Sequence, residues 1–270
     1  MAMQLVERTV ETLRTLGSAI DGLTLAEVAE QVGMPASSMH RLLATLVGQG
    51  MVLRHPDKRY TLGPEALVLA RGARSVEKYA NEGVRDLASR LDQTAFLSRW
   101  TGRRVICTSM CAGGRALRLF VEEGQELPIH AAASARIIAA YAPREAVHTI
   151  LESSALEAFT SHTPTSPERV MEILELDRAR GYDVSYDELD HGVLAVSVPV
   201  WQGVSTVTAS VTIAGPVAES EMETTAATWT VAALRLAREL SVRETGPVDA
   251  PGDSGTEGRG TAVSAREEKR

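Results

Sequence analysis

Residues 24–47 of this 270-residue chain read TLAEVAEQVGMPASSMHRLLATLV, and this stretch carries the strongest structural signal of the N-terminal part. Thr24 and Glu27 have the spacing of a capping box, in which the threonine side chain accepts from the Glu27 amide and the glutamate reaches back. Gly33 suits the end of this short helix because glycine tolerates a positive φ. Pro35 suits the first position of a second helix. The pattern predicts two helices joined by a tight turn.

The second helix, expected to end near Gln49, has two chemically different faces. Apolar side chains recur on one face at helical spacing, namely Met39, Leu42, Leu43, Leu46 and Val47. The opposite face carries small and polar side chains, namely Ser37, Ser38, His40, Arg41, Ala44 and Thr45. An arginine there can grip a phosphate or pair bidentately with guanine, and hydroxyl groups can reach phosphates or base edges. This outer face is typical of a recognition helix that enters the major groove of DNA.

The segments on either side complete the order of a winged helix-turn-helix module. A preceding helix is predicted by the helical spacing of Val6, Thr9, Val10 and Leu13. Residues 51–54 and 59–62 read as two short strands around a turn at 55–58. The residues expected to contact DNA are Ser37, Ser38, His40, Arg41, Thr45, Arg54, Lys58, Arg59 and Tyr60.

Charge is distributed unevenly along the chain. The net charge of -7 excludes a uniformly basic coat for nucleic acid. Residues 40–60 nevertheless hold four Lys or Arg side chains against one Asp. By charge alone these side chains would be interpreted as solvated surface, whereas the helix-turn-helix pattern favours contact with DNA.

One such module offers few phosphate contacts, so a monomer is expected to bind DNA weakly and to lose affinity quickly with salt. A dimer that reads two half-sites overcomes this weakness. Residues 65–91 are mostly helical in pattern. This segment either links two domains within one chain or, in part, pairs with a second copy, and the sequence leaves both interpretations open.

The rest of the chain predicts an α+β domain with an antiparallel sheet. Strands are expected at residues 94–100, 104–111, 116–121, 182–186, 193–200 and 204–214. Helices are expected at residues 133–141, 145–151, 167–180 and 220–240. From residue 241 the hydrophobic periodicity stops and Gly, Pro, Ser and charged residues take over, which predicts a disordered tail.

Motifs of enzyme chemistry are missing from this sequence. It has no phosphate-binding loop, no His-Glu-x-x-His zinc pair and no Gly-x-Ser-x-Gly elbow, and its six histidines are scattered, so we expect no cofactor and no metal site. A triad of Ser134, Asp190 and His191 can be drawn, but adjacent Asp and His do not by themselves converge on a serine. An enzyme with an attached DNA-binding module stays as the alternative, and a purely structural interaction protein is a third. The lack of a secretory leader or a membrane-spanning stretch predicts a cytoplasmic protein without membrane contact.

A ligand pocket is predicted near residues 131–135, which read AAASA and lead into a helix. Small side chains at a helix start leave room for a ligand, and the amides there favour an anion such as a carboxylate. The same small residues would also allow a helix to pack closely on a sheet. The pattern alone does not choose between these interpretations.

The chain resembles the IclR family of bacterial transcriptional regulators from about Leu5 to Leu240. In the first domain the resemblance rests on residues 25–29, 33–35, 38–46, 50–52 and 59–63. In the second domain it rests on LPIHA at residues 127–131 and on a signature formed by Gly181, Ser185, Glu188, Ala195-Val196-Ser197, Val200 and Gly215-Pro216. The sequence departs from the family at Ala135, where a glycine is usual, and the added methyl group is expected either to narrow the pocket or to alter the backbone there.

This resemblance implies a winged helix-turn-helix domain joined by a linker helix to a GAF-like effector-binding domain. It implies a homodimer or a dimer of dimers that binds double-stranded operator DNA and senses a small organic acid or aromatic metabolite. The implied effector contacts are Ala133, Ser134, Ser185, Val193, Ala195 and Thr212. The expected domains are 1–65 for DNA binding, 66–76 for the linker helix and 77–242 for effector binding, followed by a disordered tail at 243–270. The metabolite is expected to favour one arrangement of the C-terminal domains and so to change the spacing of the two recognition helices.

Overall fold

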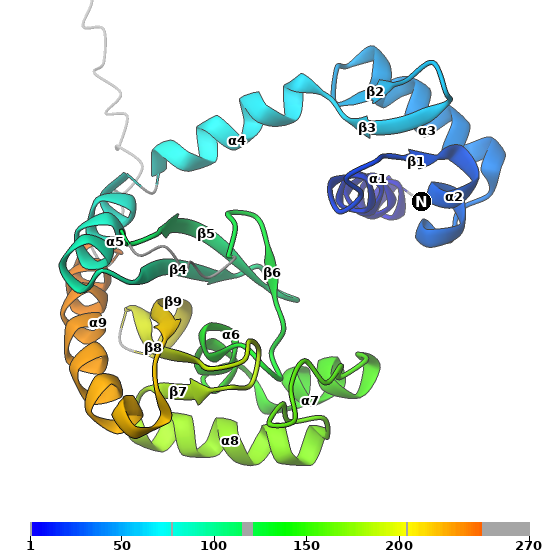
Figure 1. Ribbon diagram of the computed structural model, residues 1–270. Coiled ribbons are helices and arrows are strands. Elements are labelled where there is room, and N and C mark those ends of the chain that lie inside the picture. The colour runs from blue at the N-terminus through cyan, green and yellow to red at the C-terminus, as the bar shows by residue number, and fades with distance from the viewer. Residues whose placement is uncertain (1, 77, 115–120, 204, 245–270) are drawn as a thin grey trace, which may run out of the picture. The chain divides into compact units, whose positions relative to one another are not determined.

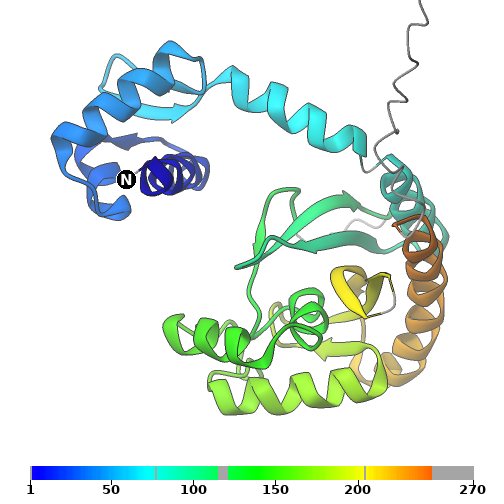
Figure 2. The same ribbon diagram turned by 180° about the vertical axis from the view of Figure 1, so that it is seen from behind.

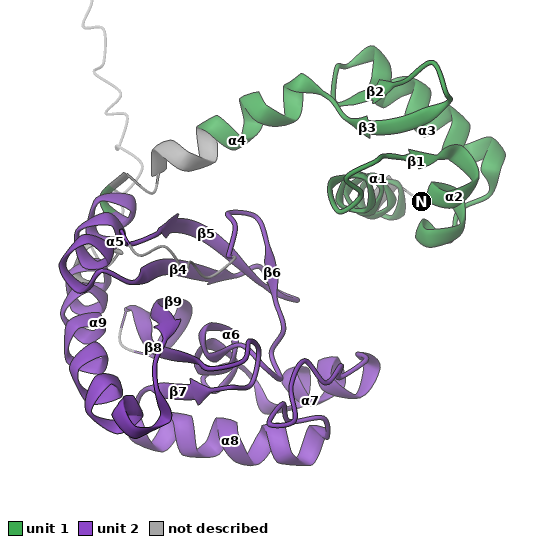
Figure 3. Cartoon of the chain, in the orientation of Figure 1, with its two compact units in different colours: residues 1–79 green, residues 80–270 purple. Residues whose placement is uncertain are grey.

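The computed structural model describes residues 2–76, 78–114, 121–203 and 205–244. These residues fall into two compact units, residues 1–79 and residues 80–270 (Figure 3). Within the described part of the chain, no helix combines the length and the apolar character needed to cross a membrane.

The first unit is a winged helix-turn-helix. Its elements are α1 (Ala2–Gly17), β1 (Leu23–Thr24), α2 (Leu25–Val32), α3 (Ala36–Gly48), β2 (Val52–Arg54), β3 (Arg59–Leu62) and α4 (Pro64–Val76). The three strands form an antiparallel sheet in the order β1-β3-β2. The apolar faces of α2 and α3 meet α1 and this sheet in one core, centred on Val28, Met39, Leu43, Leu46 and Val52.

The turn between α2 and α3 forms as its sequence predicts. Thr24 accepts a hydrogen bond from the Glu27 amide and the Glu27 carboxylate accepts one from the Thr24 amide, so both halves of the capping box are present. Gly33 ends α2 in the left-handed conformation with a φ of 65°. Pro35 differs from the prediction: its ψ of 138° is not helical, so it is the N-cap residue and α3 begins at Ala36.

Replacing Gly33 with alanine is expected to lower the free energy of unfolding by about 1–2 kcal/mol, because a Cβ atom disfavours a positive φ. Gly48 supplies the matched control: it lies in α3 and a Cβ atom there would meet open space. Gly48→Ala should instead raise stability, by roughly 0.5–1 kcal/mol. Thermal unfolding of the two variants checks the opposite signs, and equal shifts would contradict the argument.

Two features of this unit differ from the sequence-based expectation. Strand β1 was not predicted, and its two residues pair with Arg59 and Tyr60 of β3. The helix α1 was predicted, but its apolar spacing does not mark the buried face. Val6 and Val10 are exposed, whereas Thr12 is buried with its hydroxyl donating to the Arg8 carbonyl at 2.8 Å. That internal hydrogen bond explains how a polar side chain enters the core.

The second unit contains one six-stranded antiparallel sheet. The elements after α5 (Lys78–Leu91) are β4 (Thr94–Trp100), β5 (Val105–Cys111), β6 (Glu126–Leu127), α6 (Ala133–Ala139), α7 (Arg144–Ser153), α8 (Pro167–Arg180), β7 (Asp183–Tyr186), β8 (Val193–Gln202), β9 (Thr206–Pro216), a short 3-10 turn and α9 (Met222–Glu244). The strand order is β6-β5-β4-β9-β8-β7. Every neighbouring pair is antiparallel.

Helices cover both faces of this sheet (Figure 1; Figure 2). Leu194, Val196 and Val198 of β8 point to the face covered by α5 and α9. The alternate residues, including Ala195 and Ser197, point to the face covered by α6, α7 and α8. The side that faces α6 therefore has small and polar side chains, which let this short buried helix lie close to the strands.

The elements of this unit differ from the sequence-based expectation at several places. Most of the strand predicted at 116–121 lies outside the described residues, and Val121, which is described, is not in a strand. The short strand β6 was not predicted. Helix α9 continues to Glu244, past the predicted end at residue 240, because the Ser241 hydroxyl donates to the Ala237 carbonyl and accepts from the Trp201 amide. The rest of the predicted tail, residues 245–270, lies outside the described residues.

Candidate functional site

The outer face of α3 presents a row of exposed polar side chains. The exposed residues that were predicted to contact DNA from this helix are Ser37, Ser38, His40, Arg41 and Thr45. The Thr45 hydroxyl donates to the Arg41 carbonyl at 3.0 Å and keeps its lone pairs available as acceptors. The buried Met39, Leu43 and Leu46 fix the opposite face of α3 in the core. This arrangement holds the polar row outward on a rigid helix.

The wing divides the predicted DNA contacts into two groups. Arg54 and Lys58 are exposed. Arg59 is half-buried, donates to the Gly22 carbonyl at 2.7 Å and lies 3.7 Å from the Glu27 carboxylate, so it ties the wing to the start of α2. The prediction for Tyr60 needs correction, because this side chain is 5% exposed and belongs to the core.

A cavity lies in the second unit between α6 and strands β7, β8 and β9, and we call it the α6 cavity. It brings together all six positions that were predicted to contact an effector: Ala133, Ser134, Ser185, Val193, Ala195 and Thr212. It is also lined by Phe96, Val121, Leu127, Ala131, Ala132, Leu189, Asp190 and Ala214. Asp190 and Leu189 were not assigned to the pocket from sequence, although their place beside Val193 on one loop could have indicated them.

Hydroxyl groups give the α6 cavity its polar character. Ser197 and Thr212 share a hydrogen bond of 2.8 Å, and the Ser210 hydroxyl donates to the Ser134 carbonyl at 3.0 Å. The Ser134 hydroxyl is buried, and no hydrogen-bond partner for it is found among the described residues. The space open to the centres of water molecules is about 30 Å³, which is room for one or two waters. A buried hydroxyl without a partner is available to a bound molecule.

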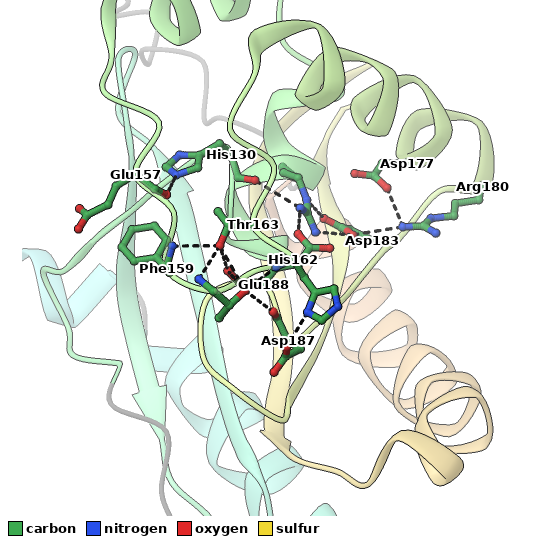
Figure 4. Close-up of polar contacts among 12 residues, drawn as sticks. His130, Glu157, Phe159, His162, Thr163, Asp177, Arg180, Asp183, Asp187 and Glu188 are labelled. Carbon is green, nitrogen blue, oxygen red and sulfur yellow. Dashed lines mark hydrogen bonds and ion pairs between the residues drawn. The ribbon is translucent and has the colours of Figure 1, made fainter.

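A buried network of charged side chains lies next to this cavity (Figure 4). The Arg136 guanidinium is fully buried, donates from Nε to the Asp183 carboxylate at 2.7 Å and also pairs with Glu188. Arg180 donates to Asp177 at 2.7 Å and to Asp183 at 3.2 Å. Ser185, which lines the cavity, lies in strand β7 three residues before Glu188. The network therefore joins α6, α8 and β7 around one side of the cavity.

Two of these carboxyl groups are perturbed by burial. Burial and the neighbouring Asp183 carboxylate raise the pKa of Asp177 to about 8, against the opposing effect of Arg136 and Arg180. Burial also raises the pKa of Glu188, although the adjacent Arg136 guanidinium opposes this shift.

The raised pKa of Asp177 predicts a specific pH dependence of stability. Its folded-state pKa lies above that of an unfolded chain, so the native protein holds a proton that the unfolded chain releases between about pH 4 and pH 8. Stability is therefore expected to fall as pH rises through this window. Asp177→Asn, which carries no titratable proton, should flatten this part of the curve. Melting temperatures of both proteins between about pH 5 and pH 8 test this, and parallel curves would refute it.

The loop at residues 187–192 is held by a second group of polar contacts (Figure 4). The Asp187 carboxylate accepts from the Gly192 amide at 2.6 Å and contacts His162 at 2.6 Å and His191 at 3.3 Å. The Thr160 hydroxyl donates to the Asp187 carbonyl at 2.5 Å. These contacts lower the pKa of Asp187, the Gly192 amide contributing most. They also fix the loop that brings Asp190 to the cavity.

The alternative triad gains no support from this geometry. His191 is highly exposed and contacts Asp187, whereas the Ser134 hydroxyl is buried in the α6 cavity. Among the described residues, no group of three or more His, Cys, Asp or Glu side chains is placed to hold a metal ion.

Both units match known family models. The model described as bacterial transcriptional regulator IclR C-terminal matches residues 71–242, and the model described as IclR helix-turn-helix domain matches residues 5–56. The chain belongs to the IclR family. It is a DNA-binding transcriptional regulator whose second unit has the GAF-like fold of IclR effector domains.

Individual IclR-family relatives agree with this assignment. The HTH-type transcriptional regulator KipR of Bacillus subtilis (strain 168) is 30% identical over 196 residues, which cover 72% of this chain and 78% of KipR. The structure of an IclR transcriptional regulator from Alicyclobacillus acidocaldarius has a TM-score of 0.73 at 27% identity and covers 88% of this chain and 98% of that one. An IclR homologue from Microbacterium hydrocarbonoxydans, complexed with 4-hydroxybenzoate, has a TM-score of 0.68 at 20% identity over 88% of this chain and 98% of that one. The curated relatives are named as regulators rather than as enzymes.

Proposed function

We propose that this regulator binds a specific operator through α3 and the wing, and that a small metabolite in the α6 cavity changes this binding. The observation that carries the first half is the exposed polar face of α3, opposite a face buried in the winged helix-turn-helix core. In this proposal Arg41 reads a base or grips a phosphate, while Ser37, Ser38, His40 and Thr45 contact base edges or phosphates. The same proposal assigns residues 1–65 to DNA binding, residues 66–76 to the linker helix and residues 77–242 to effector binding.

The wing is proposed to supply backbone contacts. Arg54 and Lys58 are exposed basic side chains on β2 and on the turn that follows it, and such groups release counterions when they meet phosphates. Arg59 and Tyr60 are proposed to position the wing without contacting DNA themselves. Arg59 donates a hydrogen bond to the Gly22 carbonyl, and the centroid of the Tyr60 ring lies 5.9 Å from the Arg54 guanidinium. We therefore leave the Tyr60 side chain out of the proposed contact surface.

The effector is proposed to be a small organic acid or aromatic acid. The α6 cavity offers the unpartnered Ser134 hydroxyl together with Ser185 and Thr212 as polar contacts, and apolar walls from residues such as Val193. A hydroxyl group on the ligand could donate to Asp190 at the exposed end of the lining. The 4-hydroxybenzoate complex of the Microbacterium relative supports this class. Because the open volume is about 30 Å³, a ring enters only when side chains around the cavity move.

The regulator is proposed to act as a homodimer, or as a dimer of dimers, in the cytoplasm. Large apolar side chains on α4 are exposed, namely Leu67, Val68 and Leu69, and α1 exposes Leu5, Val6 and Val10. Such exposed apolar surface marks an interaction site. Pairing of two copies would place two recognition helices on two half-sites, and the effector would shift the population between two spacings of these helices.

A mobility-shift experiment tests the proposed function. The full chain is titrated onto DNA from upstream of its own gene and from neighbouring operons, with unrelated DNA of equal length as the control. We expect specific retardation that weakens as salt rises, with a slope set by the number of phosphate contacts. Metabolites are then added to the retarded complex. Equal affinity for all fragments at every salt concentration would contradict sequence-specific binding.

A further inference from the structure

A second and larger cavity lies in the C-terminal unit between the turn before β5, strand β6 and the end of α7, and we call it the β6–α7 cavity. Its volume is about 180 Å³, against about 30 Å³ for the α6 cavity. It is lined by side chains from three separated parts of the chain: 103–104, 126–130 and 150–156.

Part of the lining of the β6–α7 cavity is apolar. Leu127, Ile129 and Leu151 are buried there, and Ile150 and Leu156 are half-buried. An engineered apolar cavity of roughly 150 Å³ holds a benzene molecule. The β6–α7 cavity is therefore large enough for a body of about one six-membered ring.

The mouth of the β6–α7 cavity is positively charged. Arg103 is exposed and Arg104 is half-buried, and both line the cavity. Glu126, on the facing strand β6, pairs with Arg104 at 2.7 Å. The mouth therefore contains two guanidinium groups and one carboxylate, which leaves one net positive charge. A guanidinium group matches the geometry of a carboxylate and binds it with two parallel hydrogen bonds.

The wall beside the mouth is held in place by contacts outside the cavity. The His130 ring is buried, its Nε2 hydrogen-bonds to the Glu157 carbonyl at 2.9 Å and the ring stacks on Phe159 with centroids 5.6 Å apart (Figure 4). The His130 carbonyl accepts from Arg136 of the buried network at 3.4 Å. Leu127 lines both this cavity and the α6 cavity.

We propose that the β6–α7 cavity is a second ligand site, for a small carboxylate that carries an apolar body of about the size of a six-membered ring. The ring occupies the hollow above Leu127 and Leu151, and the carboxylate meets Arg103 and Arg104 at the mouth. This site is separate from the α6 cavity, to which the proposed effector is assigned, and operator binding by α3 does not depend on it.

Calorimetric titration of the full chain with benzoate tests this site. Benzoate supplies both the ring and the charge, benzyl alcohol supplies the ring alone and acetate supplies the charge alone. We expect benzoate to bind with a dissociation constant on the order of 1 mM or tighter. The two controls should bind at least tenfold more weakly. The double variant Arg103→Gln, Arg104→Gln should weaken the affinity for benzoate by about tenfold to a hundredfold, because hydrogen bonds to charged groups are lost.

Two filling variants distinguish the cavities. Ala155→Trp places a large side chain on an exposed segment at the mouth of the β6–α7 cavity and should abolish the benzoate binding that depends on Arg103 and Arg104. Ala195→Leu fills the α6 cavity, removes any benzoate bound there and should leave the binding that depends on Arg103 and Arg104 unchanged. Binding that survives Ala155→Trp and is lost in Ala195→Leu would overturn the proposal, as would the absence of benzoate binding in the unaltered protein. Operator affinity, measured separately by mobility shift, reports on the regulator function whichever result is obtained.

Discussion

Asp183→Ala is expected to lower the free energy of unfolding of the C-terminal unit by about 3–5 kcal/mol, because it removes the main partner of a fully buried guanidinium. Asp183 accepts from both Arg136 and Arg180, and neither Asp183 nor Arg136 has exposed side-chain surface. Without Asp183, Arg136 keeps only Glu188 as a carboxylate partner among the contacts described. Chemical denaturation of the full chain, followed through the transition of the C-terminal unit, measures the loss.

The exposed ion pair of Arg144 and Glu175 is the matched control for this prediction. Both side chains are more than half exposed. Glu175→Ala should change the free energy of unfolding by less than about 1 kcal/mol, because solvent screens an exposed pair. Equal losses in Asp183→Ala and Glu175→Ala would mean that the buried network does not hold α6, α8 and β7 together.

Arg41→Ala is expected to weaken operator binding by about fivefold to 150-fold for each half-site, the range for one bidentate contact to a base. The reason is its place on the exposed face of α3, where no part of the core restrains its guanidinium group. Binding to unrelated DNA should change much less. The measurement is a mobility shift on the fragment that the unaltered protein retards, with unrelated DNA alongside.

Two other substitutions make the result for Arg41 specific. Arg14→Ala removes the same charge from α1, where Arg14 lies 3.8 Å from Glu11, and should leave DNA affinity close to that of the unaltered protein. Lys58→Ala removes a proposed phosphate contact from the wing and should weaken binding to all DNA fragments alike. The slope of log affinity against log salt concentration should become smaller by about one. If Arg41→Ala weakened binding to the specific fragment and to unrelated DNA equally, Arg41 would contact a phosphate and would not contribute to sequence specificity.

The helix-turn-helix was predictable because its signals act over a few residues. A capping box and a left-handed glycine determine the turn between α2 and α3 without help from distant segments. The strand β1 has no such signal, since its two residues form a strand only because β3 lies alongside. The helix α1 was predicted from apolar spacing, but this spacing does not indicate that Thr12 is buried, because Thr12 satisfies its own hydroxyl group within the helix.

The candidate ligand site was predictable only in part. The six proposed effector positions came from a family resemblance, and the structure groups them around one cavity. The charged network could not be predicted, because Arg136 meets partners 47 and 52 positions further along the chain. Sequence periodicity registers which face of an element is apolar. It does not indicate which polar residues of distant elements meet beneath that face.

The alternation of side chains along β8 has a consequence for how regulators of this family diversify. Leu194, Val196 and Val198 hold the sheet to α5 and α9, whereas Ala195 lines the α6 cavity from the opposite face. Strand β8 thus carries two sets of positions with different roles. One set packs the hydrophobic core, and the other set lines the cavity and determines which molecule fits there. Mutations in the second set can accumulate while the first stays constant. The product of a duplicated gene could in this way change the lining of its α6 cavity without first losing its fold.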